Sequence, residues 1–133
     1  MAKYICFICT ETNGLHKLDE PVCKKNIYGF ANLVALNYLI GYREKNKFVQ
    51  TKKVRHIIKP KCINFDETAV KIHGITQERA NKKGIDAKEA MVELQEDLRK
   101  VDFIISHNIT FHIRTLQVEC FRTYTYIDFS KFK

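Results

Sequence analysis

The order of apolar segments along this chain limits its fold more than any other feature. Five short apolar runs are typical of buried strands: residues 3–9, 31–42, 53–60, 102–106 and 124–129. The polar stretch at residues 43–52 predicts a turn between the second and third runs, so these two are expected to be antiparallel. Pro60 ends the third run, because proline cannot donate to a ladder of backbone hydrogen bonds.

Helical signals lie between and after these runs. A first helix is expected to begin near Asp66 and to end at Gly74. Asp86 with Glu89 forms a capping box for a second helix, whose apolar residues recur on one face through Val101. A third helix shows apolar residues at helical spacing: Ile109, Ile113, Leu116 and Cys120.

A helical connection between the third and fourth strands indicates a crossover, because parallel neighbours cannot be joined by a tight turn. The expected order is strand, strand, strand, helix, helix, strand, helix, strand. It predicts an α/β fold with a five-stranded mixed sheet, three antiparallel strands followed by parallel ones, flanked by helices.

Length and composition fit one soluble globular domain over residues 1–133, with 45% hydrophobic and 29% charged residues. No apolar stretch approaches the ~20 residues of a membrane span, and the first residues do not resemble a secretory signal. The five cysteines are scattered: Cys6, Cys9, Cys23, Cys62 and Cys120. They suggest neither a disulfide framework nor a zinc knuckle, so we expect reduced thiols in the cytoplasm or nucleus, for a cellular or viral gene.

The charge is strongly basic. Twenty-three Lys and Arg against fifteen Asp and Glu give a net charge of +8. The bases form clusters at Lys24–Lys25, Arg43–Lys47, Lys52–His56, Lys59–Lys61 and Asn81–Lys83. Such a surface favours polyanions through phosphate contacts and counterion release. The alternative is a lysine-rich composition that only keeps the protein soluble.

Four stretches, in this order, resemble the DEDD-type 3′–5′ exonucleases, the DnaQ-like family of the ribonuclease H-like fold. Residues 5–15 (ICFICTETNGL) are similar to the family's apolar strand followed by Asp-x-Glu-Thr-x-Gly. Residues 31–40 resemble its second strand, and residues 56–60 and 69–84 resemble its segment leading through His-Gly-Ile-Thr. Residues 102–119 (DFIISHNITFHIRTLQVE) resemble its strand, its His-Asn pair and the aromatic-Asp pair that opens a helix.

The resemblance implies a catalytic site that has lost most of its acids. The family uses four carboxylates with a histidine or tyrosine. Glu11 matches the family's Glu, whereas Cys9 and His112 stand at two Asp positions. The third motif, a His followed five residues later by an Asp on a final helix, has no match. The resemblance therefore implies a degenerate, C-terminally truncated copy that lacks the family's last helix.

Such enzymes hydrolyse a phosphodiester with two divalent ions, Mg²⁺ or Mn²⁺ in active relatives. Mg²⁺ prefers oxygen ligands, so the thiol of Cys9 and the imidazole of His112 are poor replacements for carboxylates. Glu11 alone cannot hold two ions. We therefore expect no bound cofactor and no hydrolysis.

The resemblance also implies a cleft for the 3′ end of single-stranded DNA or RNA. The matching positions are Thr12, Asn13, Gly14, Leu15, His73, His107 and Asn108. Each also has a structural interpretation, such as Gly14 in a turn, Asn108 as a helix cap, Leu15 in the core or His73 as a satisfied near-core histidine. A protein partner or a larger assembly remains an alternative to nucleic acid.

Two further hypotheses keep the chain an enzyme. Cys9, Glu11 and His112 form a ligand set suited to Zn²⁺, which would make a metal-dependent exonuclease with an altered site. Alternatively, the chain is the front piece of a longer or split exonuclease, whose missing helix comes from elsewhere.

Overall fold

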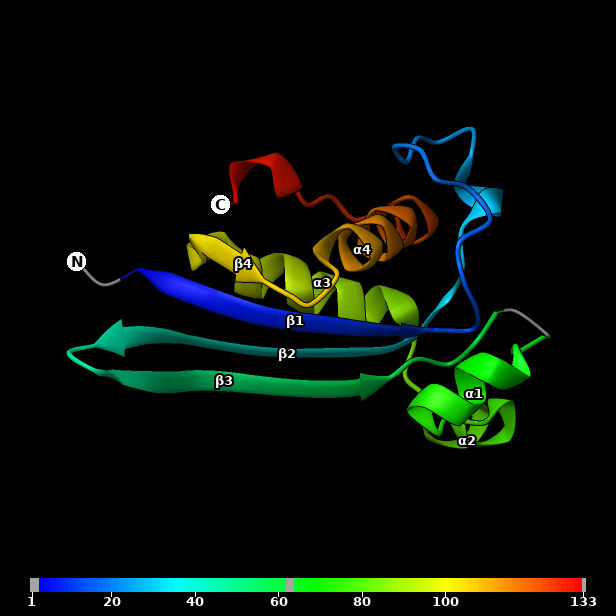
Figure 1. The fold of residues 1–133 in the computed structure, drawn as a ribbon, viewed down its shortest axis with the longest axis horizontal. Coiled ribbons are helices and arrows are strands. Elements are labelled where there is room, and N and C mark those ends of the chain that lie inside the picture. Colours follow the sequence, from blue (N-terminus) through cyan, green and yellow to red (C-terminus); the bar gives the residue numbers. More distant parts are fainter. Residues whose placement is uncertain (1–2, 62–63, 133) are drawn as a thin grey trace.

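The computed structural model describes residues 3–61 and 64–132 and shows a mixed sheet covered by helices (Figure 1). The strands are β1 (Tyr4–Thr12), β2 (Leu33–Glu44), β3 (Lys47–Ile57) and β4 (Phe103–Ile105). Their spatial order is β3-β2-β1-β4, with β1, β2 and β3 antiparallel and β4 parallel to β1. The predicted α/β class, mixed sheet and crossover are confirmed.

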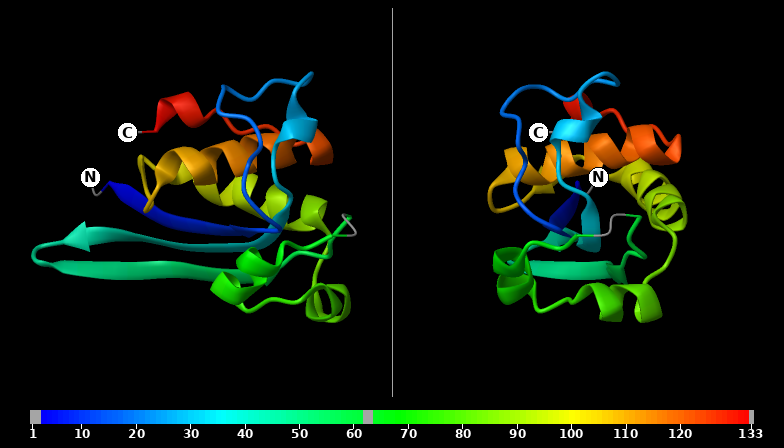
Figure 2. Two further views of the ribbon diagram at one scale, coloured as in Figure 1. Left: turned by 45° about the vertical axis from the view of Figure 1, so that its right-hand side comes forward. Right: turned by 90° about the vertical axis from the view of Figure 1, so that its right-hand side faces the viewer.

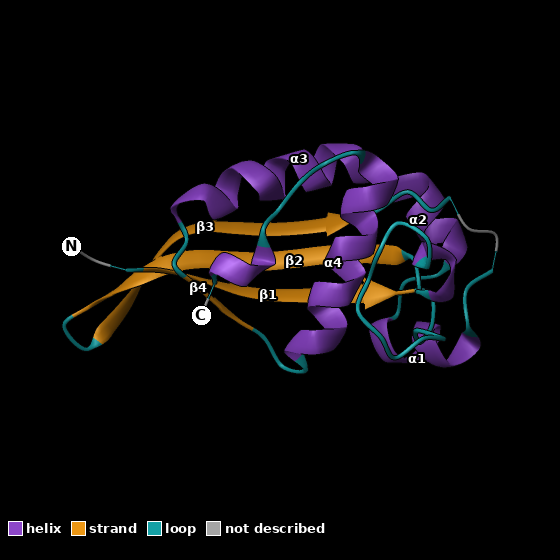
Figure 3. Ribbon diagram, turned by 90° about the horizontal axis from the view of Figure 1, so that it is seen from above, coloured by secondary structure: helices purple, strands orange, loops and turns teal. Residues whose placement is uncertain are grey.

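The α-helices are α1 (Glu67–His73), α2 (Gln77–Lys83), α3 (Ala87–Asp97) and α4 (Ile109–Thr123). Single-turn 3₁₀ helices are η1 (Ile27–Gly29), η2 (Leu98–Lys100) and η3 (Phe129–Lys131). Helices α3 and α4 lie over one face of the sheet, whereas α1 and α2 lie at its end (Figure 3). The backbone N–H of Thr68 donates to the Asp66 side chain at the start of α1, and Gly74 ends that helix at a φ of 73°.

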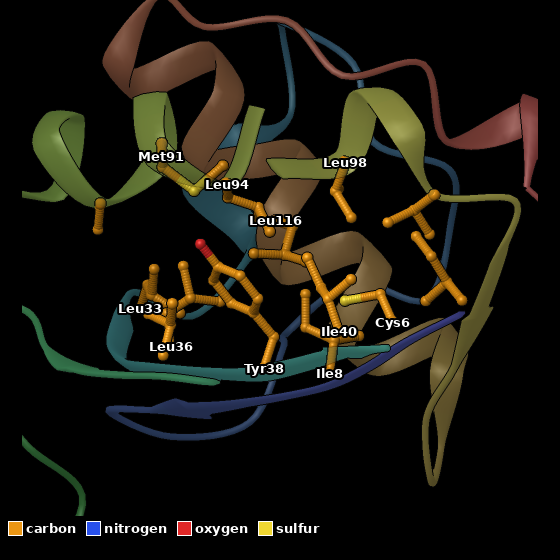
Figure 4. Packing of buried hydrophobic residues seen from close by; sticks show 14 of the residues in the cluster. Cys6, Ile8, Leu33, Leu36, Tyr38, Ile40, Met91, Leu94, Leu98 and Leu116 are labelled. Atoms are coloured by element: carbon orange, nitrogen blue, oxygen red, sulfur yellow. The ribbon is translucent and has the colours of Figure 1, made fainter. Parts of the chain in front are cut away.

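The core fills the space between the sheet and the two long helices (Figure 4). Because side chains alternate along a strand, Cys6 and Ile8 of β1 point into it. Leu94 of α3 and Leu116 of α4 meet them from the other side. A smaller cluster beneath α1 and α2 contains Val34, Ala35, Ile75 and Ala80.

The sheet has four strands rather than the predicted five. Residues 124–128 are irregular, and the chain then forms η3. Tyr124 ends α4 in the left-handed region at a φ of 56°, and Tyr126 is 75% exposed. The aromatic and β-branched residues of this run therefore lie in a loop and not in a strand.

Helix α2 was also missed by the sequence analysis. Thr76 accepts a hydrogen bond from the backbone of Arg79 and starts this helix. Ala80 is its buried residue, so the segment carries no apolar repeat from which a helix could be read. The hairpin between β2 and β3 is longer than predicted, because its turn occupies only Lys45 and Asn46.

Alternation along β3 divides the basic cluster there into two sets. Lys52 and His56 face α3, where Lys52 pairs with Glu93 at 3.0 Å and with Asp97 at 2.7 Å. The His56 ring contacts Glu93 at 2.6 Å. Lys53 and Arg55 point to the other face of the sheet and are exposed. Half of this cluster therefore stabilises the fold, and half is left for solvent or a ligand.

The segment between β1 and β2 folds back beside α4 (Figure 2). Arg122 of α4 donates hydrogen bonds to the carbonyl oxygens of Ile27, Phe30 and Ala31, and it pairs with buried Glu119 at 3.0 Å. His16 accepts a bond from the Ala31 backbone N–H. These contacts fix the position at which the chain leaves β1.

Cysteines Cys6, Cys9, Cys23 and Cys120 are free thiols, and Cys62 lies outside the described residues. Cys6 is buried and Cys9 exposed, as their placement on opposite faces of one strand predicts. None of the described helices has the length and hydrophobicity that a membrane crossing requires.

Candidate functional site

A pocket of about 530 Å³ lies at the end of β1, between α1 and the amino end of α4. Nine of the ten site residues predicted from the sequence line it: Cys9, Glu11, Thr12, Gly14, Leu15, His73, His107, Asn108 and His112. Asn13 lines a neighbouring pocket instead. We call the first pocket the cleft.

The short β4 explains how these residues meet. β4 pairs with β1 only from Ile5 to Phe7, and the chain then turns into α4. The rest of β1 therefore runs past the amino end of α4, where Ser106 donates to the Ile8 carbonyl oxygen. Segments about a hundred residues apart in sequence, at the ends of β1 and β4, therefore line the same cleft.

His112 lies in the first turn of α4 and contacts the edge of β1. Its Nδ1 accepts the backbone N–H of Thr10 at 3.0 Å and lies 2.7 Å from the Thr10 hydroxyl oxygen. Burial lowers the pKa of His112, and a backbone hydrogen bond at His107 opposes that shift only in part. The ring is therefore neutral at pH 7, and its Nδ1 is already hydrogen-bonded to β1.

Cys9 and Glu11 lie on the other face of β1 from Thr10, two residues apart. Burial and the charge of Glu11 raise the pKa of Cys9. The Cys9 side chain is thus a neutral thiol at pH 7. Of Cys9, Glu11 and His112, Glu11 alone contributes a carboxylate.

These residues do not fit a metal centre. Among the described residues, no group of three His, Cys, Asp or Glu side chains is arranged to hold a metal ion. Nδ1 of His112 is bonded to Thr10, and Cys9 lies on the other face of β1 from Thr10. The predicted zinc set of Cys9, Glu11 and His112 is therefore not arranged as a metal site, and Glu11 is the one carboxylate that these three residues offer to Mg²⁺.

The outer cleft is apolar. Leu15 is 82% exposed and Ile72 is 77% exposed, so both line the cleft without being part of the core. The interpretation of Leu15 as a core residue is wrong. Phe111 forms a wall and stacks on His16 with ring centroids 4.3 Å apart. Exposed apolar side chains around a polar floor suit a ligand with a flat apolar part and a charged part.

His107 and Asn108 supply free polar groups. Neither side chain has a hydrogen-bond partner among the described residues, and both line the cleft. Asn108 precedes α4 at a φ of 55°, and its side chain does not cap the helix. Its carbonyl oxygen accepts the N–H groups of Phe111 and His112, whereas those of Ile109 and Thr110 have no bond among the described residues. A helix start of this kind favours an anion.

The remaining predicted residues have structural contacts. His73 approaches the Thr12 carbonyl oxygen at 3.0 Å through Nε2, and its Nδ1 accepts the Ile75 N–H. Asn13 bonds the backbones of Asn32 and Asn64. These contacts support the interpretation of His73 as a satisfied histidine.

Two other predicted residues complete the floor of the cleft. The Thr12 hydroxyl donates to the Gly14 carbonyl oxygen at 2.6 Å. A Cβ on Gly14 would meet Asp66 at an ordinary 3.5 Å, so neither packing nor backbone conformation demands glycine there.

Sequence reasoning missed six lining residues: Thr10, Asp66, Thr68, Ala69, Ile72 and Phe111. Helical spacing offered a signal for some of them. Ala69, Ile72 and His73 fall at i, i+3 and i+4, so His73 implied that its neighbours share its face. Thr10 carried no such signal, because its role depends on a partner in α4.

The architecture around this cleft is a mixed α/β fold that solved structures of exonuclease I share. A product-bound exonuclease I has a TM-score of 0.74 at 17% identity, covering 94% of this chain and 27% of that one. Escherichia coli exonuclease I in complex with a dA16 oligonucleotide gives 0.70 at 17% identity, over 92% and 24%.

A complex of exonuclease I with SSB-Ct gives 0.72 at 17% identity, over 94% and 25%. The chain therefore spans about a quarter of the length of these proteins. At such identity the likeness shows the fold alone. No protein-family model and no curated protein sequence matches this chain.

Proposed function

We propose that this chain binds the 3′ end of single-stranded nucleic acid in the cleft and does not hydrolyse it. The observation that carries the proposal is the Thr10–His112 contact. It places a neutral ring, already hydrogen-bonded, at a position where the family resemblance implies an acid. Asp66 also lines the cleft, but its side chain accepts the Thr68 N–H at the start of α1. Glu11 alone therefore remains beside Cys9 and His112, and one carboxylate cannot hold the two ions of that chemistry.

Binding is supported by the remaining chemistry of the cleft. Leu15, Ile72 and Phe111 offer apolar surface for a terminal base. The open N–H groups at the start of α4 and the side chain of Asn108 offer donors for a phosphate. The net charge of +8 favours a polyanion over a neutral ligand.

Two solved structures with a similar fold are consistent with nucleic-acid binding in the cleft. Exonuclease I has been seen in complex with a dA16 oligonucleotide, and another structure of it is product-bound. We extend nucleic-acid binding from those proteins to the present chain as a proposal.

We also propose an intracellular, reducing location for the protein. The free thiols are consistent with such a compartment.

The test is a gel shift with single- and double-stranded DNA and RNA, run beside a nuclease assay with Mg²⁺ and Mn²⁺. We expect a shift with single strands and no shortening of a 5′-labelled oligonucleotide with either ion. Metal-dependent 3′–5′ shortening that Glu11→Gln abolishes would instead establish an altered or split exonuclease. Absence of any shift at low salt would favour a protein partner.

A further inference from the structure

The face of the sheet opposite α3 and α4 is open and carries a second groove. This groove has a volume of about 420 Å³ and lies over β1, β2, β3 and the end of β4. Cross-strand pairing places Lys53, Leu39, Phe7 and Ile105 in one row on this face. Arg55, Asn37 and Cys9 form the next row.

The first row is apolar along most of its length. Phe7 is 41% exposed and Ile105 is 46% exposed, although both belong to strands. Phe48 of β3 contacts the Phe7 ring edge-to-face at a centroid distance of 5.5 Å. A large exposed aromatic with a fixed ring is a platform on which a base can stack.

The two cations on β3 border this apolar row. Lys53 and Arg55 have no ion pair or hydrogen bond among the described residues, unlike Lys52 on the other face of the same strand. Among the described strand residues, alternation places one acid on the open face, Glu11, and it lies in the cleft. The groove therefore has a positive end at β3.

The groove and the cleft are continuous. Cys9 and His107 line both of them. β1 and β3 lie two strand spacings apart, about 10 Å, a distance that a few nucleotides can span. A strand whose 3′ end occupies the cleft can thus reach Lys53 and Arg55 across the exposed Phe7.

We propose that single-stranded nucleic acid continues from the cleft over the open face of the sheet, with bases against Phe7 and phosphates at Lys53 and Arg55. This inference rests on the proposed function of the cleft and adds the path of the strand. The unpaired cations favour a nucleic acid over an apolar protein segment as the occupant, because the latter would leave both charges unsatisfied.

The test compares a short oligonucleotide of about two nucleotides, which is confined to the cleft, with a long one of about sixteen, in fluorescence anisotropy titrations at several salt concentrations. Lys53→Gln/Arg55→Gln should weaken binding of the long strand by about tenfold or more. Its log–log salt slope should fall by about 1.4, since each single-strand phosphate contact contributes about 0.7. Binding of the short strand should not change.

Lys24→Gln/Lys25→Gln is the matched control, because it removes two exposed charges from the segment beside α4 on the other side of the sheet. It should leave the salt slope unchanged. Phe7→Leu keeps apolar volume but removes the stacking ring, and should weaken long-strand binding by about fivefold.

The outcomes separate the two proposals. If neither strand binds the unmodified protein, the proposed function of the cleft fails. If the long strand binds equally well to Lys53→Gln/Arg55→Gln and to the unmodified protein, the path over the sheet is wrong while the cleft stands. Equal losses in the control and the sheet variant would also overturn the path.

Discussion

Thr10 and His112, 102 positions apart, are joined by a backbone N–H of β1 that donates to the Nδ1 of a ring in the first turn of α4. The Thr10 hydroxyl lies 2.7 Å from the same nitrogen. Together they make His112 a contact between the sheet and α4. The contact links the proposed loss of hydrolysis to the stability of the fold.

Replacing His112 with Ala should destabilise the protein. The Thr10 N–H and hydroxyl are buried, and loss of their acceptor costs about 1–3 kcal/mol in the free energy of unfolding. Urea unfolding monitored by circular dichroism measures this change. His107→Ala is the control, because that side chain is exposed and should change stability by less than about 0.5 kcal/mol. Equal effects would contradict the structural role of His112.

Stability should fall as the pH decreases from 7 toward 5. Burial lowers the pKa values of His16 and His112 below 6.5, so the unfolded chain takes up protons in this range before the folded protein does. The unfolding free energy therefore decreases as the pH falls through 6.5. Thermal unfolding of the parent protein and of His16→Gln/His112→Gln at several pH values measures this dependence.

The double variant should show a flatter pH dependence than the parent protein. A parent protein that becomes more stable on acidification to pH 5 would contradict the assigned direction of the shifts.

Introducing two acids should create ion binding more than catalysis. Cys9→Asp/His112→Asp places two carboxylates beside Glu11, which gives Mg²⁺ the oxygen ligands that it prefers. We expect Mg²⁺ binding, measurable by isothermal titration calorimetry, with little hydrolysis. Addition of Glu11→Gln to the double variant should weaken it. Mg²⁺ affinity unchanged from the parent protein would show that the three positions do not converge.

The Arg122 side chain should hold the segment after β1 in place. Arg122→Ala leaves the buried carboxylate of Glu119 without its partner, which costs about 3–5 kcal/mol. We expect faster proteolytic cleavage within residues 17–30 and a lower urea midpoint. Arg114→Ala removes a pair with fully exposed Asp19 and should have little effect on either measurement.

Binding of single-stranded DNA should depend on the cleft and on salt. Asn108→Gly removes the free amide while suiting the left-handed backbone there, and Leu15→Ser removes exposed apolar surface. Both should weaken binding in anisotropy titrations. Affinity of the parent protein should fall steeply between low and physiological salt. Tyr124→Ser, which changes an exposed residue at the other end of α4, should have no effect.

Local chemistry made most of the fold predictable. Helix α1 begins after Asp66 and ends at Gly74 as expected, because helix capping and a left-handed glycine at a helix end depend on only a few neighbouring residues. The signals that predicted β1 and α3, a short apolar run and an apolar helix face, were equally local. The prediction of a strand over residues 124–129 was wrong, because aromatic content alone does not provide a neighbouring strand with which to pair.

The candidate site was predictable as a group of residues, but not as a geometry. Glu11 lies near the end of β1, and His107 and Asn108 follow the adjacent strand β4, so all three reach the cleft. The hydrogen bond from the Thr10 N–H to His112 depends on where β4 ends, which no local pattern specifies. The alternative interpretation of Leu15 as a core residue failed because hydrophobicity does not reveal which side of a turn faces solvent.

The shortness of β4 also bears on aggregation. Beyond Phe7, the outer edge of β1 has no strand beside it, and unpaired edges invite strands of other molecules. Two side chains close this edge: Ser106 donates to the Ile8 carbonyl oxygen, and His112 accepts the Thr10 N–H. They act as a cap against intermolecular β-pairing, so variants that remove both should form β-rich oligomers more readily than the parent protein.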